Sequence, residues 1–273
     1  MISKYCSSII KPMLIDTHAH LFWDSYKDDL EEVLVRAKAA GVTKIIVPGT
    51  NVESSQKAIQ LAKKYPSVIY PAVGIHPEEI LISSENTKYE IQNSKQILNL
   101  KQMITENREH VVAVGEIGTD ASTQELKNCM GEQKVLFREQ CEMALEHDLP
   151  VIIHTRNSLA EALEVLDALP TMPRGQFHCF SHDEEGVKQV LSRGFYVSFC
   201  GNIAWSKRVA KLVPLVPSER LLLETDSPFM KPGERNESAN VTITGQIIAD
   251  LRGVSLQALG EQTTENAIKL FKL

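Results

Sequence analysis

Two histidines stand two residues apart near the start of the chain, in the stretch IDTHAHL. His18 and His20 follow the short apolar run 14–16. If extended backbone continues through this stretch, alternate side chains point the same way, so Asp16, His18 and His20 share one face. Two imidazoles on one face can bind a divalent metal ion, while an acidic neighbour orients one of the rings. The same pattern is also compatible with polar residues that only form hydrogen bonds with one another near a strand end.

Further residues of metal-binding type stand at or just after the ends of other apolar runs. They are His76 after 68–73, Glu116 after 111–115, His154 after 151–153, His178 after 175–177, and Asp226 after 221–224. A carboxylate beside a buried strand is costly unless it is solvated, hydrogen-bonded or bound to a cation. Glu224 lies two positions before Asp226 and is expected to face the same side as a partner of a ligand. Asp120 is expected to be a turn residue, with contact to a metal-bound water as the alternative.

This set of residues favours a metal-dependent hydrolase. Imidazole and carboxylate ligands together suit zinc, manganese, nickel or iron, and suit magnesium less well. The six candidate ligands are more than one catalytic ion needs: His18, His20, Glu116, His154, His178 and Asp226. We therefore expect two divalent ions (Zn, Mn, Mg or Ni) bridged by a shared carboxylate, an arrangement that holds both a nucleophilic water and a leaving oxygen. Motifs for other chemistry, such as GxSxG, a P-loop or GxGxxG, do not occur in the sequence.

The elements that must position these residues alternate along the chain. Eight short apolar runs are expected as strands: 14–16, 44–48, 68–73, 111–115, 151–153, 175–177, 195–199 and 221–224. Helix-like segments are expected near 25–40, 52–64, 95–107, 124–147, 157–168, 183–192, 205–213, 240–252 and 255–271. Such alternation predicts parallel strands, and eight of them match a closed (β/α)₈ TIM barrel, whose active site lies at the carboxyl ends of its strands. A doubly wound open sheet is the alternative, but its glycine-rich first turn is missing.

One domain is expected over residues 13–273, with residues 1–12 as an N-terminal extension. Residues 78–94 are polar and weakly periodic, so we expect an excursion or loop there, either at the entrance of the site or as a plain surface insertion. The five scattered cysteines form no CxxC pair and predict reduced thiols in a cytoplasmic protein. No segment reads as a signal peptide or a membrane span.

Net charge limits the class of partner. With 29 basic and 35 acidic residues among 273, the chain carries a formal charge of −6. This argues against a protein that coats nucleic acid through bulk electrostatics, but it allows an enzyme with a local cationic groove.

The ordered motifs resemble the TatD family of metal-dependent deoxyribonucleases, a branch of the amidohydrolase superfamily. The matching blocks span nearly the whole chain from Leu14 onward: IDTHAHL (15–21), GIHPE (74–78), AVGEIGTD (113–120), LPVIIHTR (149–156), FHCFS (177–181), LLLETDSPF (221–229), RNE (235–237) and TTENAIKLF (263–271). The sequence departs from the family pattern at Thr119, His182 and Ser238. None of these is an expected ligand, and all three lie in segments expected to line the entrance.

The resemblance implies roles for individual residues. One ion would be held by His18, His20, Glu116 and Asp226, and the second by Glu116, His154 and His178. Glu116 would bridge the two ions, and Asp226 would also orient or deprotonate the attacking water. His76 would face the substrate and bind phosphate or assist the leaving group. Arg235 would contact phosphate or hold the loop after the eighth strand, with a structural salt bridge as the alternative.

Three functions remain open at this point. The first is a phosphodiesterase that trims single-stranded DNA from an end, with aromatic residues that follow strand ends as stacking surfaces; the alternative is that these residues cap the barrel core. The second keeps the metal ions but hydrolyses an ester or amide of a small molecule, or an aminoacyl-tRNA. The third is a catalytically idle metal-binding scaffold, and the complete set of six ligands argues against it.

Overall fold

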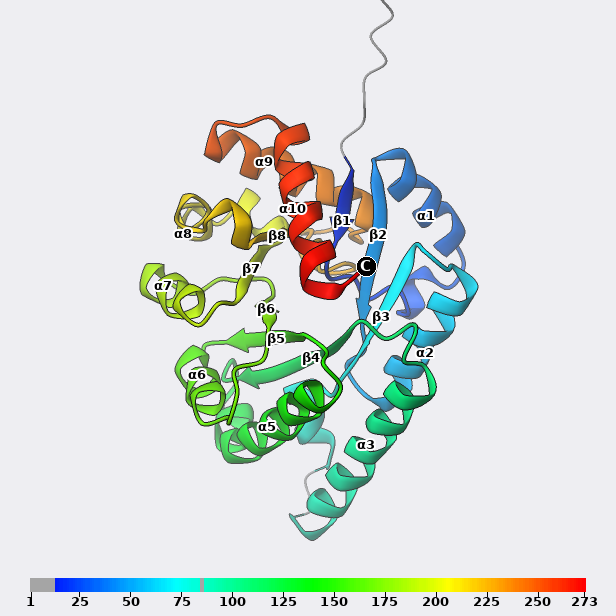
Figure 1. Ribbon diagram of the computed structural model, residues 1–273, viewed down its shortest axis with the longest axis vertical. Helices are drawn as coiled ribbons and strands as arrows, with labels where there is room; N and C mark the ends of the chain where they lie inside the picture. Colours follow the sequence, from blue (N-terminus) through cyan, green and yellow to red (C-terminus); the bar gives the residue numbers. More distant parts are fainter. Residues whose placement is uncertain (1–12, 84–85) are drawn as a thin grey trace, which may run out of the picture.

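The computed structural model describes residues 13–83 and 86–273, and the expected extension 1–12 lies outside them. Eight parallel strands follow one another in sequence order around a barrel (Figure 1). They are β1 (Leu14–Asp16), β2 (Val42–Pro48), β3 (Ile69–Val73), β4 (Ala113–Asp120), β5 (Val151–Arg156), β6 (Gly175–Phe177), β7 (Tyr196–Phe199) and β8 (Leu221–Leu223). The expected (β/α)₈ barrel is therefore confirmed.

Contacts between the first and last strands bring the ring of strands nearly to closure. The backbone N–H of Thr17 donates to the carbonyl of Leu223 at 3.0 Å, and a parallel bridge joins Ala19 to Ser227. Both contacts lie just beyond the carboxyl ends of β1 and β8. The segment that carries His18 is thereby fixed directly beside the segment that carries Asp226.

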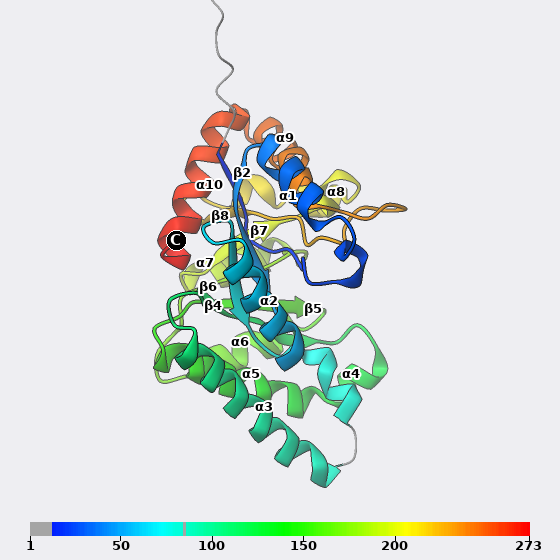
Figure 2. The same ribbon diagram turned by 90° about the vertical axis from the view of Figure 1, so that its right-hand side faces the viewer.

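Helices surround the strands (Figures 1 and 2). They are α1 (Leu30–Ala39), α2 (Val52–Lys64), α3 (Asn86–Glu106), α4 (Gln124–Asn128), α5 (Met130–Glu146), α6 (Leu159–Asp167), α7 (Glu184–Ser192), α8 (Lys207–Ala210), α9 (Val241–Arg252) and α10 (Leu256–Phe271). Short 3₁₀ helices are η1 (Asp24–Tyr26), η2 (Pro77–Ser83), η3 (Gly201–Ala204), η4 (Val213–Leu215), η5 (Ser218–Arg220) and η6 (Ser238–Asn240). Because the helices and the barrel interior cover both faces of the strands, the strands are apolar and almost entirely buried.

The last helix, α10, covers the end of the barrel at which the strands begin. The hydroxyl of Thr264 donates to the carbonyl of Met13, just before β1, and the amide of Asn266 donates to the carbonyl of Leu221, the first residue of β8. Leu270 and Phe271 pack in one apolar cluster with residues from seven of the strands. Because α10 covers this end of the barrel, an active site is expected at the opposite end, where the strands finish.

Two expectations about local structure are wrong. Strand β4 continues to Asp120, so Glu116 lies within it rather than after it. Within 78–94, residues up to Ser83 belong to η2, residues 84–85 lie outside the described residues, and α3 begins at Asn86. The segment is therefore a short excursion through η2 followed by the start of α3, and the expected loop does not extend over residues 86–94. Residues 86–94 contain neither glycine nor proline, and adding turns to an existing helix costs little compared with starting one.

Candidate metal centre

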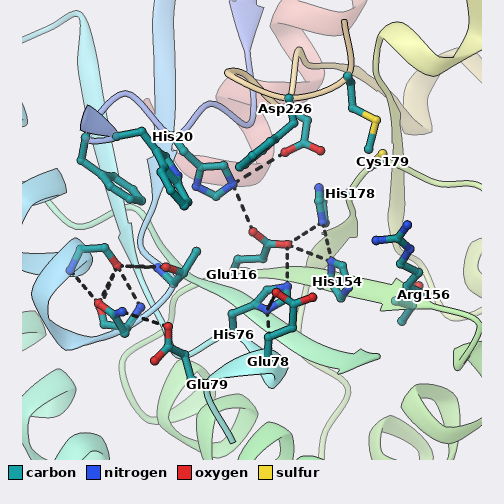
Figure 3. Close-up of a pocket in the computed structure, with 18 of the residues that line it drawn as sticks. His20, His76, Glu78, Glu79, Glu116, His154, Arg156, His178, Cys179 and Asp226 are labelled. Carbon is teal, nitrogen blue, oxygen red and sulfur yellow. Dashed lines mark hydrogen bonds and ion pairs between the residues drawn. The ribbon is translucent and has the colours of Figure 1, made fainter. Parts of the chain in front are cut away.

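The six expected ligands come together at the carboxyl ends of the strands, around the carboxylate of Glu116. Figure 3 shows all of them except His18. One oxygen, Oε2, lies 3.2 Å from Nε2 of His18 and 3.4 Å from Nε2 of His20. The other, Oε1, lies 2.8 Å from Nε2 of His178 and 3.0 Å from Nδ1 of His154. Glu116 therefore stands between two pairs of imidazoles, one facing each of its oxygens.

Contacts on the far side of the rings decide which nitrogen faces the centre. The carbonyl of Pro48 lies 3.1 Å from Nδ1 of His20 and can only accept, so Nδ1 carries the proton and Nε2 keeps its lone pair. In the same way Asp120 Oδ2, at 2.9 Å, fixes Nε2 of His154 as the donor and leaves its Nδ1 free. Hydrogen bonds of this kind are what hold metal-ligating histidines in the correct tautomer.

The spacing of the inward-facing nitrogens fits a divalent ion on each side of Glu116. The two nitrogens of the His18–His20 pair are 3.1 Å apart, and those of the His154–His178 pair are 3.2 Å apart. Ligand atoms bound about 2.0–2.1 Å from a tetrahedral ion stand roughly 3.3 Å from one another. Nδ1 of His18 is buried and has no hydrogen-bond partner among the described residues. The chemistry and spacing of this donor set therefore suit zinc or a similar ion.

Burial and mutual contact shift the pKa values of these groups. Burial by itself raises the pKa of Glu116, but the electrostatic influence of the neighbouring imidazoles of His178, His18 and His76 outweighs it and brings the pKa well below its usual range. Burial lowers the pKa of His178, yet the carboxylate of Glu116 raises it well above normal. The centre therefore keeps Glu116 ionised, the form that a bridging ligand requires.

Asp226 lies at the edge of the first pair of imidazoles. Its Oδ1 is 3.8 Å from Nε2 of His18 and 3.7 Å from Nε2 of His20. Burial raises the pKa of Asp226 to about 7. Its backbone has a φ of 55°, in the left-handed region, and its N–H donates to the carbonyl of His18 at 2.9 Å. The closing contacts between β1 and β8 thus aim this carboxylate at the centre.

His76 lies on the side of the second pair. Its Nδ1 accepts the backbone N–H of Glu78 at 3.2 Å, which leaves the proton of the neutral ring on Nε2. That Nε2 is 3.4 Å from Oε1 of Glu116. His76 therefore presents a hydrogen-bond donor to the centre and to the cavity in front of it.

Arg235 is not brought to the centre. Its guanidinium forms two hydrogen bonds to the carboxylate of Asp29, one to each oxygen, a third to the carbonyl of Ser25, and stacks over the ring of Tyr26 at 4.7 Å. Arg235 is also not among the described residues that line the cavity. This geometry matches the structural salt bridge considered as the alternative for Arg235, and the same contacts hold the loop after β8.

Asp16 also differs from its expected role, since its carboxylate accepts from Thr225 and from the backbone N–H of His18 and does not orient an imidazole ring. Asp120 is not the turn residue that the sequence favoured: it ends β4, and its carboxylate accepts a hydrogen bond from Nε2 of His154, a contact that was not among the expected roles. Glu224 lies beside an expected ligand, as the sequence predicts: its Oε1 is 3.6 Å from Nδ1 of His178. The only sequence signal for Asp120 was its even spacing from Glu116 along a strand.

Gly118 allows β4 and β5 to come together beside the centre. It has a φ of 146°, and a Cβ atom at this position would lie 2.0 Å from the carbonyl oxygen of His154. Gly118 is paired with His154 in the strand register. Only glycine fits here, and its close approach sets His154 beside Glu116.

A cavity of about 780 Å³ opens in front of the centre. This is within the range of small-molecule sites and is large enough for a nucleotide. The residues that line it include apolar ones (Phe22, Trp23, Phe229 and Met230), acidic ones (Asp24, Glu53, Glu78 and Glu79) and the cations Lys57 and Arg156. The cavity thus offers both apolar and charged contacts.

A parallel barrel that gathers histidines and carboxylates at the carboxyl ends of its strands defines a metal-dependent hydrolase. The family model for TatD related DNase matches residues 15–272, so the chain belongs to this family. It is 34% identical over 268 residues to the metal-dependent hydrolase YabD of Bacillus subtilis, covering 96% of this chain and 100% of that one. It is 33% identical to the 3'-5' ssDNA/RNA exonuclease TatD of Erwinia billingiae, over 95% and 99% of the two chains.

Among solved structures, the Escherichia coli TatD homologue YJJV superposes with a TM-score of 0.85 at 29% identity, covering 95% of this chain and 98% of that one. The fold and the family agree on a metal-dependent hydrolase of ester bonds. In the described part of the chain, no helix is long and apolar enough to cross a membrane.

Proposed function

We propose that this protein is a two-metal phosphodiesterase that removes nucleotides from an end of single-stranded DNA. The observation that carries the proposal is the position of Glu116, with one oxygen facing His18 and His20 and the other facing His154 and His178. A carboxylate with an imidazole pair on each side is the arrangement that a bridging ligand needs. Divalent ions held there supply Lewis-acid chemistry, because they lower the pKa of water and offset negative charge on phosphate oxygens.

The protein's own residues supply the proton transfers. Asp226, at the edge of the first pair of imidazoles, accepts a proton from the attacking water. His76 donates from Nε2 to a phosphate oxygen or to the departing oxygen, because its Nδ1 is occupied by the N–H of Glu78. Arg156, exposed at the cavity wall, contacts a non-bridging phosphate oxygen. Zinc and manganese suit the imidazole-rich donor set better than magnesium does.

A pair of aromatic rings at the cavity mouth supports a single-stranded substrate. Trp23 and Phe229 meet edge to face with centroids 5.6 Å apart, and their side chains are 44% and 45% exposed. Both line the cavity that contains Glu116. An unpaired base can stack on such a surface, whereas a base within a duplex cannot reach it. The Erwinia relative is named a 3'-5' exonuclease, which supports entry of the 3′ end.

Hydrolysis of a labelled single-stranded oligonucleotide tests this proposal. Metal-free protein is resupplied with Zn²⁺, Mn²⁺ or Mg²⁺, alongside a Glu116→Gln variant that keeps the shape of the side chain but removes its charge. We expect metal-dependent release of mononucleotides by the wild type and none by the variant. Release that is unchanged in Glu116→Gln, or cleavage of duplex as fast as single strand, would count against the proposal.

A variant of Trp23 tests the stacking surface separately. Loss of one base–aromatic stack costs about 1–3 kcal/mol, so Trp23→Ala should raise KM for the oligonucleotide roughly tenfold. Hydrolysis of a small aryl phosphodiester should be unaffected, because it has no base to stack. Trp205→Ala is the matched control, since Trp205 is 50% exposed but is not among the described residues that line the cavity.

The charge of the cavity mouth favours one other substrate class. Apart from the expected ligands Glu116 and Asp226, four acidic side chains line the cavity against two lysine or arginine side chains, and the whole chain is acidic. A neutral or cationic ester, such as an aminoacyl ester, would meet less repulsion there than a phosphodiester. Turnover of such esters, with no nucleotide release from any DNA, would favour this alternative.

We also place the protein in the cytoplasm. Cys129, Cys141, Cys179 and Cys200 are free in the structure, and free thiols persist in a reducing compartment.

A further inference from the structure

Two thiols meet at the wall of the cavity. Cys179 lines the cavity, and Cys200 is fully buried behind it. Their Sγ atoms are 3.0 Å apart. A disulfide bond is about 2.03–2.05 Å long, so the sulfurs need to approach by only about 1 Å to be joined.

The barrel itself brings these two residues together. Cys179 comes two residues after the end of β6, and Cys200 comes directly after β7. The register of these neighbouring strands pairs Phe177 with Val197, and beyond it the N–H of Phe180 donates to the carbonyl of Ser198 at 3.0 Å. Backbone hydrogen bonds thus hold both sides of the thiol pair, so the contact does not depend on a loop movement.

Cys179 is also directly connected to the metal centre. It follows His178 in the chain, and its backbone N–H donates to Oε1 of Glu224 at 2.6 Å. The same oxygen lies 3.6 Å from Nδ1 of His178, and the other oxygen of Glu224 accepts from Ser198 at 2.6 Å. Glu224 is thus a neighbour of both Cys179 and His178, and we expect a movement of Cys179 toward Cys200 to disturb the carboxylate beside His178.

We propose that Cys179 and Cys200 form a reversible disulfide when a hydroperoxide enters the cavity, and that this bond inhibits the enzyme. The sulfur of Cys179, the member that lines the cavity, attacks one peroxide oxygen; the O–O bond breaks, leaving a sulfenic acid and releasing water or an alcohol. The sulfur of Cys200 then attacks that of Cys179, the S–O bond breaks, and a water leaves. Two thiols lose two electrons and two protons, and the peroxide is reduced. Thiol reductants reverse the change by exchange.

Peptide mapping of the full, metal-loaded chain tests the bond. Each described cysteine falls in a different tryptic peptide: Cys129 in 128–134, Cys141 in 139–156, Cys179 in 175–188 and Cys200 in 194–207. After hydrogen peroxide and alkylation of the remaining thiols, we expect peptides 175–188 and 194–207 joined and lighter by two hydrogens. No joined pair, or Cys179 joined to any cysteine other than Cys200, would overturn the proposal.

Two further readouts test the inhibition. Oxidation should lower the rate of hydrolysis roughly tenfold and should weaken metal retention against a chelator to a similar degree. Loss of a residue that positions a metal ligand has effects of this size. Dithiothreitol should restore both the rate and the metal retention. Metal retention reports on the centre whatever the substrate is. Cys200→Ala, and Cys200→Ser if the smaller side chain destabilises the fold, should resist peroxide, while Cys129→Ala should remain as sensitive as the wild type. A bond that forms without changing either readout would contradict the inhibition.

Discussion

Asp120 accepts a hydrogen bond from Nε2 of His154 across 2.9 Å, and this contact turns the opposite nitrogen of the ring toward Glu116, 3.0 Å away. Burial by itself raises the pKa of Asp120, but the hydrogen bond from His154 and those at Ser122 bring it down to about 2, so it stays ionised. The orientation of the expected ligand His154 is thus fixed by Asp120, a carboxylate that is not itself an expected ligand.

Asp120→Asn should therefore weaken metal binding. The amide cannot hold the imidazole as firmly as the carboxylate does, and loss of such a partner lowers metal affinity by about 10–100-fold. Titration of metal-free protein with Zn²⁺ against a chromophoric chelator measures the change. Asp167→Asn, on the exposed surface of α6, serves as control and should bind as the wild type does. Equal affinities in the two variants would show that Asp120 does not position His154.

Asp226→Asn should keep bound metal but lose most turnover. The amide can still coordinate through its oxygen, but it cannot accept a proton from the attacking water. General-base catalysis contributes about 10²–10⁴-fold, and kcat should fall by that order. Metal content and kcat are to be measured on the same preparation. A rate near that of the wild type, on a verified substrate, would exclude the role given to this carboxylate.

Glu78→Gln should improve action on nucleic acid at low salt. The side chain is 58% exposed at the cavity mouth, where its charge repels phosphate. Removing one charge should raise kcat/KM for an oligonucleotide a fewfold, and the gain should disappear as salt shortens the Debye length to about 3 Å at 1 M. Kinetics at two ionic strengths provide the measurement. A loss of activity, or a gain independent of salt, would indicate a different role for Glu78.

Arg235→Ala distinguishes contact with phosphate from a structural role in holding the loop after β8. The bidentate pair with Asp29 joins the loop after β8 to the segment before α1, so its loss should lower the melting temperature by a few degrees. KM for an oligonucleotide should not change, because the guanidinium is already occupied. Thermal unfolding and kinetics of the same variant provide both values. A raised KM with an unchanged melting temperature would instead support contact with phosphate.

Much of the centre could be predicted because a parallel barrel converts position along the chain into position in space. His18, His154 and His178 lie far apart in sequence, yet each comes near the carboxyl end of an apolar strand, and all these ends open on one face. The strand pattern alone therefore predicts that these side chains meet. The motifs in family order then indicated which of them share a metal ion.

The remaining features depend on information that a linear pattern does not hold. Glycines interrupt the apolar pattern of β4, which concealed its continuation to Asp120. The contact between Cys179 and Cys200 depends on the register of β6 against β7, and neither cysteine lies in a recognisable motif. Arg235 has its partner in Asp29, more than two hundred residues earlier in the chain. Tertiary pairing of this kind is decided by the folded topology.

Anomalous diffraction from crystals soaked with Mn²⁺ or Zn²⁺ tests the central claim most directly, because it locates bound ions without reference to any substrate. The account predicts two peaks about 3.5–4 Å apart with Glu116 between them. One should be flanked by His18 and His20, and the other by His154 and His178. A single peak, or two peaks that do not share Glu116, would contradict a centre bridged by this carboxylate.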